Sequence, residues 1–95
     1  NSKNSALMYA SWYGNTDAVN TLLKSKANVN IQNVSGETAL MWAAWNGYID
    51  IVRALLNAGA DLNTKNKDGN SALVFAKNKG HTEIIELLRS AGAVD

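Results

Sequence analysis

Few residues in this sequence have side chains suited to catalysis or metal binding, and their spacing assembles no site. His81 is the only histidine and cysteine is absent, so neither a metal site built from histidines and cysteines nor a disulfide can form. We interpret His81, which follows Gly80, as a hydrogen-bonding residue at a helix start. The stretch NKDGN at 66–70 resembles part of a calcium-binding loop but lacks the terminal glutamate of such loops. The sequence therefore predicts no bound metal and no cofactor.

The acidic residues form no catalytic pair. Asp17, Asp50 and Glu83 stand 33 residues apart, each near the start of a predicted helix, where a carboxylate interacts favourably with the helix dipole. No nucleophile, base and orienting group stand at spacings that would form a catalytic set. The glycines are spaced as turn residues and not as a phosphate-binding loop. We therefore predict that the chain is not an enzyme.

Composition and charge exclude several other classes. The 95 residues are 46% hydrophobic and 18% charged, as in one small folded domain. A net charge of +1 is too small to attract nucleic acid or an anionic membrane surface. No apolar run approaches the roughly 18–20 residues of a membrane span. The lack of cysteine fits a reducing compartment, so we expect a cytoplasmic location, although the abrupt start at NSKNSAL leaves a signal peptide upstream open.

The residues that could bind a partner belong to a segment that occurs three times. The copies are KNSALMYASWYG (3–14), GETALMWAAWNG (36–47) and GNSALVFAKNKG (69–80), and each begins 33 residues after the last. The register continues through the apolar positions that follow each copy. A fixed period of this length predicts a solenoid, in which each unit buries its apolar face against its neighbours.

The middle copy predicts a helix with defined ends. Thr38 is the expected N-cap, because its hydroxyl can accept a free backbone N–H of the first turn. Leu40, Ala43 and Ala44 then fall on one face, where the small alanines permit close approach of another helix. Gly47 ends the helix, because glycine adopts the left-handed conformation without a penalty.

A second helix follows over 48–57, with its apolar residues on one face, and Gly59 ends it. The polar, turn-rich stretch 60–69 then connects one unit to the next. Each unit is therefore a helix, a turn, a second helix and a loop, and the predicted fold class is all-α.

The run GETALMWAAWNGYIDIVRALLNAGADLN (36–63) resembles an ankyrin repeat, with the family's threonine cap, leucine, paired alanines, glycine and final loop in order. The resemblance covers essentially the whole chain as a single domain, with units at 1–30, 31–63 and 64–95. It implies an ankyrin-repeat solenoid of stacked helix-turn-helix hairpins joined by extended β-turn loops. Alanine replaces the family's usual proline after the cap, and Lys26 stands where the other copies have a glycine of positive φ.

The third unit differs from the second at stacking positions. Lys77 and Arg89 replace Ala44 and Leu56, and a terminal unit needs a polar outer surface. We therefore expect a C-terminal capping repeat that ends near Asp95. The first unit shows no such change, so we expect the chain to be a monomeric fragment of a longer array.

The tryptophans separate into two groups when the copies are compared. Trp42 corresponds to aromatic residues in both other copies, a pattern that indicates packing between units. Trp45 corresponds to Trp12 but also to Asn78, so the fold itself does not require an indole there. We expect Trp12 and Trp45 to lie away from the buried face and to serve as binding anchors in the concave groove.

What the resemblance implies for function is recognition of another protein through the loop tips and the inner helix surface. A partner with an apolar anchor and an acidic flank would fit the candidate contacts. The alternative is an assembly or spacer segment of a larger protein, with no dedicated partner of its own. By position, the candidate contacts are Asn4, Trp12 and Tyr13 in the first unit, Gln32, Val34, Ser35, Glu37, Trp45 and Asn46 in the second, and Lys65, Lys67, Asp68, Asn70, Asn78 and Lys79 in the third.

Overall fold

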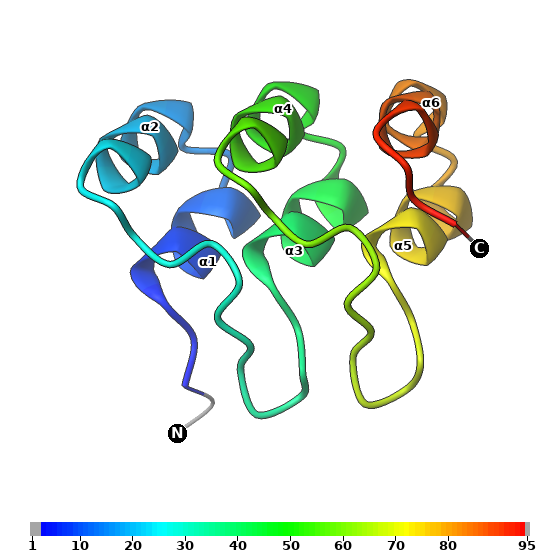
Figure 1. Ribbon diagram of the computed structural model, residues 1–95, viewed down its shortest axis with the longest axis horizontal. Coiled ribbons are helices and arrows are strands. Elements are labelled where there is room, and N and C mark those ends of the chain that lie inside the picture. Colours follow the sequence, from blue (N-terminus) through cyan, green and yellow to red (C-terminus); the bar gives the residue numbers. More distant parts are fainter. Residues whose placement is uncertain (1–2, 95) are drawn as a thin grey trace.

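The computed structural model describes residues 3–94, which form helices joined by turns and loops, with no strand among them (Figure 1). The ends of the first and third predicted units, residues 1–2 and Asp95, lie outside the described residues. The predicted all-α stack of helical hairpins is confirmed. The helices are α1 (Ala6–Trp12), α2 (Thr16–Lys24), α3 (Ala39–Asn46), α4 (Ile49–Asn57), α5 (Ala72–Lys79) and α6 (Thr82–Ser90).

The first helix of each pair begins at a side-chain cap, as the sequence predicts. The hydroxyls of Ser5, Thr38 and Ser71 accept backbone N–H groups of α1, α3 and α5 at 3.1, 3.3 and 3.4 Å. Each cap residue is extended, and this lets its side chain turn back onto the first turn. Local chemistry therefore fixes where these helices begin.

The first helices end at glycine. Gly47 and Gly80 cap α3 and α5 with φ of 83° and 72°. In α1 the helix ends one residue earlier, so that Tyr13 is the C-cap and Gly14 follows it with φ of 72°. Positive φ at all three positions confirms that glycine ends these helices for a backbone reason.

The second helices of the last two units begin without a side-chain cap. Tyr48 and His81 occupy the N-cap positions of α4 and α6, but neither side chain bonds to its own helix. His81 instead places Nε2 3.0 Å from the carbonyl oxygen of Trp45 in the preceding unit. His81 is therefore a hydrogen-bonding residue at a helix start, as predicted, but its ring bonds across the boundary between units and not to its own helix.

These two rings cover the glycines of the preceding unit. A Cβ built on Gly14 would lie 2.8 Å from the Tyr48 ring, and one on Gly47 would lie 2.7 Å from the His81 ring. A Cβ on Gly80 would meet nothing within 4 Å. Gly14 and Gly47 are therefore required for two reasons: their positive φ and the lack of space for a side chain.

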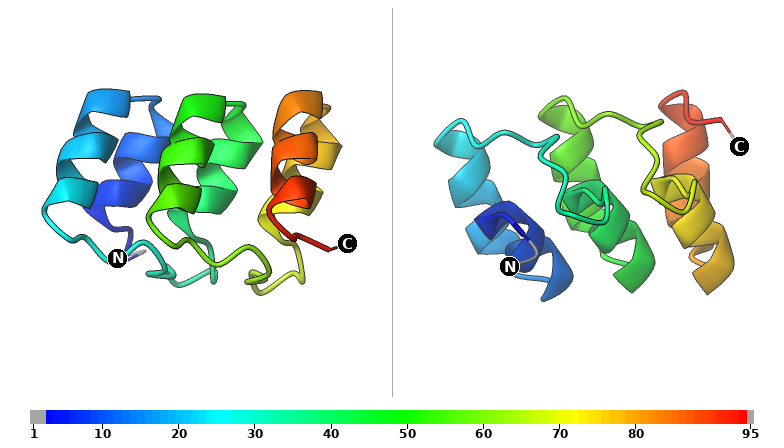
Figure 2. Two further views of the ribbon diagram at one scale, coloured as in Figure 1. Left: turned by 45° about the horizontal axis from the view of Figure 1, so that its top comes forward. Right: turned by 90° about the horizontal axis from the view of Figure 1, so that it is seen from below.

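The helices form two rows (Figures 1 and 2). α1, α3 and α5 lie side by side in one row, α2, α4 and α6 lie in the other, and the connecting loops extend beyond the first row. Neighbouring helices contact each other more extensively in the first row than in the second. Ala43 and Ala44 are fully buried there, and their small side chains permit this close approach.

A continuous core runs through the stack between the rows. Leu40 of α3 and the Ile51, Val52 and Leu55 face of α4 are buried, and equivalent residues of the other pairs join the same cluster. Lys77, by contrast, is exposed on the outer side of α5, although it occupies the repeat position of a buried alanine.

Asparagine side chains organise the loops between units. The Oδ1 of Asn33 accepts the backbone N–H groups of Ser35 and Glu37, and Asn66 does the same one unit later for Asp68 and Asn70. The two loops are joined directly, because the Lys67 N–H donates to the Ser35 carbonyl at 3.0 Å. The β-turn loops are therefore built by a repeated asparagine and stacked on each other.

Another asparagine position links the connecting segments. Asn30 accepts the backbone N–H of Asp61 at 2.8 Å, and Asn63 accepts that of Val94 at 3.3 Å. Each bond joins one unit to the next. The sequence analysis did not find these links, although the 33-residue spacing of Asn30 and Asn63 marks them.

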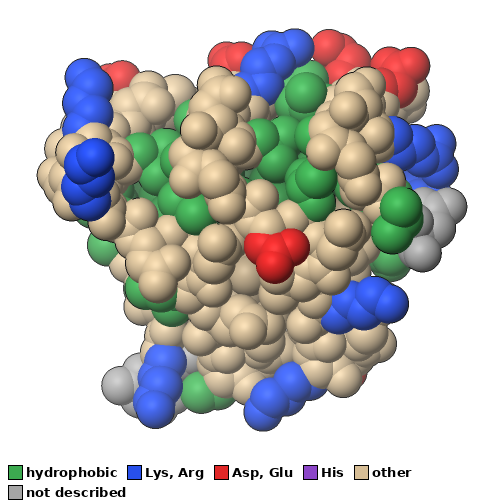
Figure 3. All heavy atoms as spheres, viewed as in Figure 1, with side chains coloured by type: hydrophobic (Ala, Val, Ile, Leu, Met, Phe, Trp, Pro, Cys, Tyr) green, Lys and Arg blue, Asp and Glu red, His purple; other side chains and the backbone are tan. Residues whose placement is uncertain are grey.

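Lys26 has φ of 66°, which confirms the predicted left-handed conformation at this position. On the face that Figure 3 shows, apolar side chains gather over the layer of second helices, while lysines and arginines are spread around the edge without forming one basic patch. Among residues 3–94, no helix combines the length and apolar character needed to cross a bilayer.

Candidate functional site

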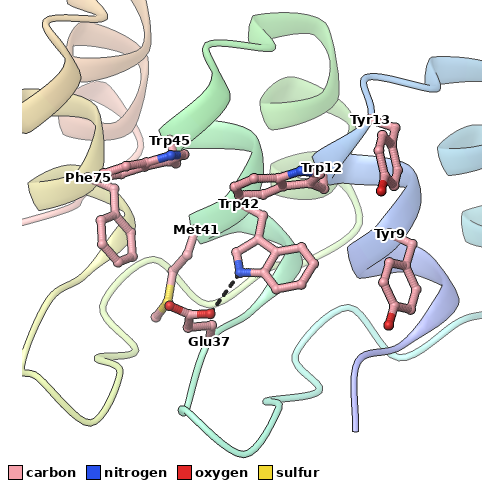
Figure 4. A pocket seen from close by; sticks show the side chains of 8 residues that line it. All are labelled: Tyr9, Trp12, Tyr13, Glu37, Met41, Trp42, Trp45 and Phe75. Carbon is pink, nitrogen blue, oxygen red and sulfur yellow. Dashed lines mark hydrogen bonds between the residues drawn. The ribbon is translucent and has the colours of Figure 1, made fainter. Parts of the chain in front are cut away.

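Aromatic side chains from the first helices form two rows that run across the three units (Figure 4). We name the Tyr9, Trp42 and Phe75 set the mid-helix row and the Trp12 and Trp45 pair the helix-end row. Each helix-end tryptophan lies three residues after a mid-helix aromatic, a spacing that places both on the same side of a helix. The 33-residue period then repeats each row from unit to unit.

The rows interlock across the unit boundaries. The Trp12 ring lies 5.3 Å from Trp42 at 71°, and the Trp45 ring lies 5.5 Å from Phe75 at 87°. Tyr9 lies 6.3 Å from Trp42 at 68°. All three are edge-to-face contacts, which aromatic rings favour over flat stacking. Each helix-end tryptophan therefore contacts the mid-helix ring of the next unit.

This geometry confirms the predicted packing role of Trp42, while the anchor role of Trp12 and Trp45 stays a prediction. Trp42 packs between units, as expected. Trp45 does so too: it is half-buried, as Trp42 is, and does not stand free in the groove. Asn78, at the same repeat position in the third unit, is exposed, so the comparison between copies did not reveal this contact of Trp45.

A hydrogen-bonded chain holds the mid-helix row against the loops. Glu37 Oε1 accepts the indole N–H of Trp42 at 3.0 Å and the amide of Asn33 at 3.4 Å. Asn33 also donates to Asn4 at 2.9 Å, and Asn4 donates to the Tyr9 hydroxyl at 3.2 Å. These hydrogen bonds connect the loop of the second unit to the Tyr9 and Trp42 rings and so fix both rings in place. They also place the Glu37 carboxylate at the groove.

A cation already lies over one ring of the helix-end row. The Lys79 ammonium is 4.7 Å from the centroid of the Trp45 ring. At this distance the electron-rich face of the indole attracts the charge.

The rings enclose a groove of about 310 Å³. Tyr13, Tyr9 and Trp12 are 74%, 48% and 38% exposed and form its open side. Glu37 is the only charged residue of the lining. The residues that line the groove are Tyr9, Trp12, Tyr13, Glu37, Met41, Trp42, Trp45 and Phe75.

Four predicted contact residues meet in this groove, namely Trp12, Tyr13, Glu37 and Trp45. Asn46, which was also predicted, is half-buried and donates to the Trp42 carbonyl of its own helix at 3.0 Å.

The other predicted contacts lie outside the groove lining. Most are exposed, and Asn4 and Asn70 are half-buried. Some of the exposed loop residues have local bonds, such as Gln32, whose amide donates to the Gly36 carbonyl at 2.9 Å. The exposed predicted contacts outside the groove are Gln32, Val34, Ser35, Lys65, Lys67, Asp68, Asn78 and Lys79.

The sequence analysis missed four groove residues: Tyr9, Met41, Trp42 and Phe75. Three of them are the mid-helix row, which it interpreted only as packing. The spacing of this row indicates that it lines the groove, because residues three positions before the helix-end tryptophans lie on the same side of the helix. A ring that packs between units can also line a groove.

The acidic side chains do not gather around a site. In the part of the chain that the structure describes, no group of three or more histidine, cysteine, aspartate or glutamate side chains could hold a metal ion. The groove instead presents ring faces, one thioether and one carboxylate, which suit binding by shape and charge.

Comparison with protein families agrees with the repeat structure. A family model for ankyrin repeats (3 copies) matches residues 1–66, and one for ankyrin repeats (many copies) matches residues 47–89. No curated protein gives a significant match. Because the first model alone covers more than half of the sequence and agrees with its period and helix pairs, the chain belongs to the ankyrin-repeat family.

Proposed function

We propose that this chain is a non-enzymatic protein-binding module that holds a segment of a partner protein in the aromatic groove. Ankyrin repeats are generally protein–protein interaction modules. The observation that supports the groove as the site is the set of partly exposed aromatic side chains around a defined hollow. Aromatic residues of this kind make strong contacts because they bury a large area at little cost in side-chain entropy.

The size of the groove limits what enters it. A hollow of about 310 Å³ holds one or two side chains, not a folded domain. The partner therefore contributes a short segment, and the surface beside the groove contributes the remaining contacts.

The loop tips are the proposed flanking contacts. Val34 is 45% exposed at one tip, and Lys65, Lys67 and Asp68 are exposed in the next loop. The two lysines suit an acidic flank of the partner segment, while the loop stacking through Ser35 keeps both tips on one surface.

The test compares capture of partners by the unchanged chain and by matched variants. Trp12→Ala and Tyr13→Ala each remove an exposed ring of the groove lining, whereas Asn20→Ala changes an exposed residue of α2 in the other helix row. We expect a specific partner to be retained by the Asn20 variant and lost by both ring variants. Retention by all three variants would place the binding surface elsewhere.

The second candidate function is an assembly or spacer segment without its own partner. One observation favours it: Trp12 and Trp45 each contact the next unit, so both indoles have a role in the stack itself. If this function is correct, no protein will be captured specifically, and both ring variants will change only stability.

A further inference from the structure

We infer that the groove recognises a methylated lysine of the partner segment, with the aromatic ring faces and the Glu37 carboxylate binding its methylated ammonium. This inference rests on the proposed protein-binding function and identifies the side chain that enters the groove. It replaces the purely apolar anchor that the sequence suggests, because the groove contains a carboxylate whose negative charge an apolar side chain would not neutralise.

The arrangement of the rings suits a cation. Neighbouring rings meet at 71°, 68° and 87°, so they form walls that stand nearly at right angles. A cation between such walls contacts more than one ring, and each ring face carries partial negative charge. A flat stack of rings would offer only its outermost faces.

A single negative charge lies beside the rings. Glu37 is the only charged residue of the lining, and its Oε1 is held by the Trp42 indole at 3.0 Å. Its carboxylate is half-buried, where a charge interacts more strongly with an opposite charge than it does in open water. The lining thus combines ring faces with one fixed negative charge.

The molecule already places a cation of its own on this surface. Lys79 holds its ammonium 4.7 Å from the Trp45 ring centroid. Lys79 is outside the lining, so the rings of Trp12, Trp42 and Tyr9 beside Glu37 remain for a cation from a partner.

Hydrogen bonding selects a methylated lysine over an unmodified one. An unmodified ammonium has three N–H donors and loses their water partners on entry. The lining offers few acceptors, since Glu37 Oε1 and the Tyr9 hydroxyl already accept bonds from Trp42 and Asn4. Each methyl group replaces one N–H donor, so trimethylation removes all three, and the methyl groups make favourable contacts with the rings.

The decisive measurement compares two probes that differ only in charge. Choline carries the quaternary ammonium, and dimethylbutanol is its uncharged isostere, in which carbon replaces nitrogen. The three tryptophans of the chain all line the groove, so titrated intrinsic tryptophan fluorescence reports directly on this site. We expect choline to bind about tenfold more tightly than dimethylbutanol. Equal binding of the two probes, or no binding of either, would overturn the inference.

A second titration tests whether the bound cation is a methylated lysine of a protein. We expect a short peptide with trimethyllysine to bind at least tenfold more tightly than the same peptide with unmodified lysine. Equal binding of the two peptides would overturn the inference. So would a preference for phosphatidylcholine vesicles over the methylated peptide, which would make the groove a lipid site.

Matched carboxamide variants test the role of the charge. Glu37→Gln keeps an oxygen to accept the Trp42 indole but removes the negative charge, and Glu86→Gln makes the same change at an exposed site on α6. We expect Glu37→Gln to weaken choline binding severalfold and to leave dimethylbutanol binding unchanged. Glu86→Gln should change neither. An equal loss for both probes in Glu37→Gln would indicate a structural role for Glu37 only.

These probes are independent of the partner. If choline fails to bind selectively while partner capture still depends on Trp12, the methyllysine inference is wrong and the protein-binding function stands. If choline binds selectively but no protein is captured, the groove binds cations and the proposed protein-binding function is wrong.

Discussion

The second and third units share a backbone but differ in what lies beside them. Gly47 and Gly80 have similar φ values of 83° and 72°, yet a Cβ would strike the His81 ring at Gly47 and meet nothing at Gly80. In the same units, Ala44 is fully buried, whereas Lys77 is exposed. A repeat position therefore carries two separable requirements. One is its backbone conformation, shared by every unit, and the other is its fit against a following unit, which applies only where one follows.

The largest effect that this comparison predicts is for Ala44→Lys, which gives the second unit the residue of the third. A lysine at this site puts a charge into the contact between α3 and α5, at a cost of about 4 kcal/mol or more. Because a small domain is stable by only about 5–15 kcal/mol, the variant should be largely unfolded at modest urea concentrations.

The matched change is Lys77→Ala in the third unit. It alters an exposed site and should change the free energy of unfolding by less than about 1 kcal/mol. Urea titrations followed by circular dichroism would compare the two variants. An unchanged midpoint for Ala44→Lys would contradict the close packing of these helices.

The next effects concern the tryptophans. Trp45→Ala should destabilise by about 2 kcal/mol, since it removes a half-buried ring and its contact with Phe75. Trp12→Ala should cost about 1 kcal/mol, because Trp12 is 38% exposed but contacts Trp42. Asn78→Ala, at the same repeat position, should change stability by less than about 0.5 kcal/mol. If Trp45→Ala proves as mild as Asn78→Ala, then Trp45 is a free binding anchor, as the sequence alone predicts.

Alanine substitutions at the helix-ending glycines should separate the requirement for positive φ from the requirement for a fit against the next unit. Gly80→Ala should cost about 1 kcal/mol for the positive φ alone. Gly47→Ala should cost about 2 kcal/mol, because the new methyl group also displaces the His81 ring from its bond to the Trp45 carbonyl. Thermal or chemical unfolding of both variants would measure the difference.

The His81→Ala background gives the control for that pair. Without the ring, Gly47→Ala should cost no more than Gly80→Ala does, which a double-mutant cycle can test. A difference that persists in this background would mean that something other than His81 distinguishes the second unit from the third.

The fold could be predicted from the sequence because its signals are local. A cap at Thr38, an apolar face three and four residues apart, and a glycine at Gly47 each act within one helix, and all three are found as predicted. The groove could be predicted only in part, because its walls form between units. The contacts of Trp45 with Phe75 and of His81 with Trp45 depend on how closely neighbouring helices pack, which no single copy encodes.

The smallest effect compares the first and second units at the end of their second helices. Lys26 and Gly59 both have positive φ, 66° and 91°, so the lysine pays of order 1 kcal/mol for its left-handed backbone. Lys26→Gly removes that strain but gives the unfolded chain about 0.4–1 kcal/mol more conformational freedom, so we expect a net gain of only a few tenths of a kcal/mol.

The reciprocal change, Gly59→Lys, tests the same repeat position in the second unit. A Cβ on Gly59 would meet nothing within 4 Å, so lysine adds no clash with a neighbouring unit, and only the backbone term remains. We therefore expect Gly59→Lys to lose about as much stability as Lys26→Gly gains, a few tenths of a kcal/mol in each direction. Paired urea titrations would measure both midpoints. A much larger loss for Gly59→Lys would show that the second unit is strained there by a contact that the first unit lacks. A lower midpoint for Lys26→Gly would show that the Lys26 side chain stabilises the first unit by more than its backbone conformation costs.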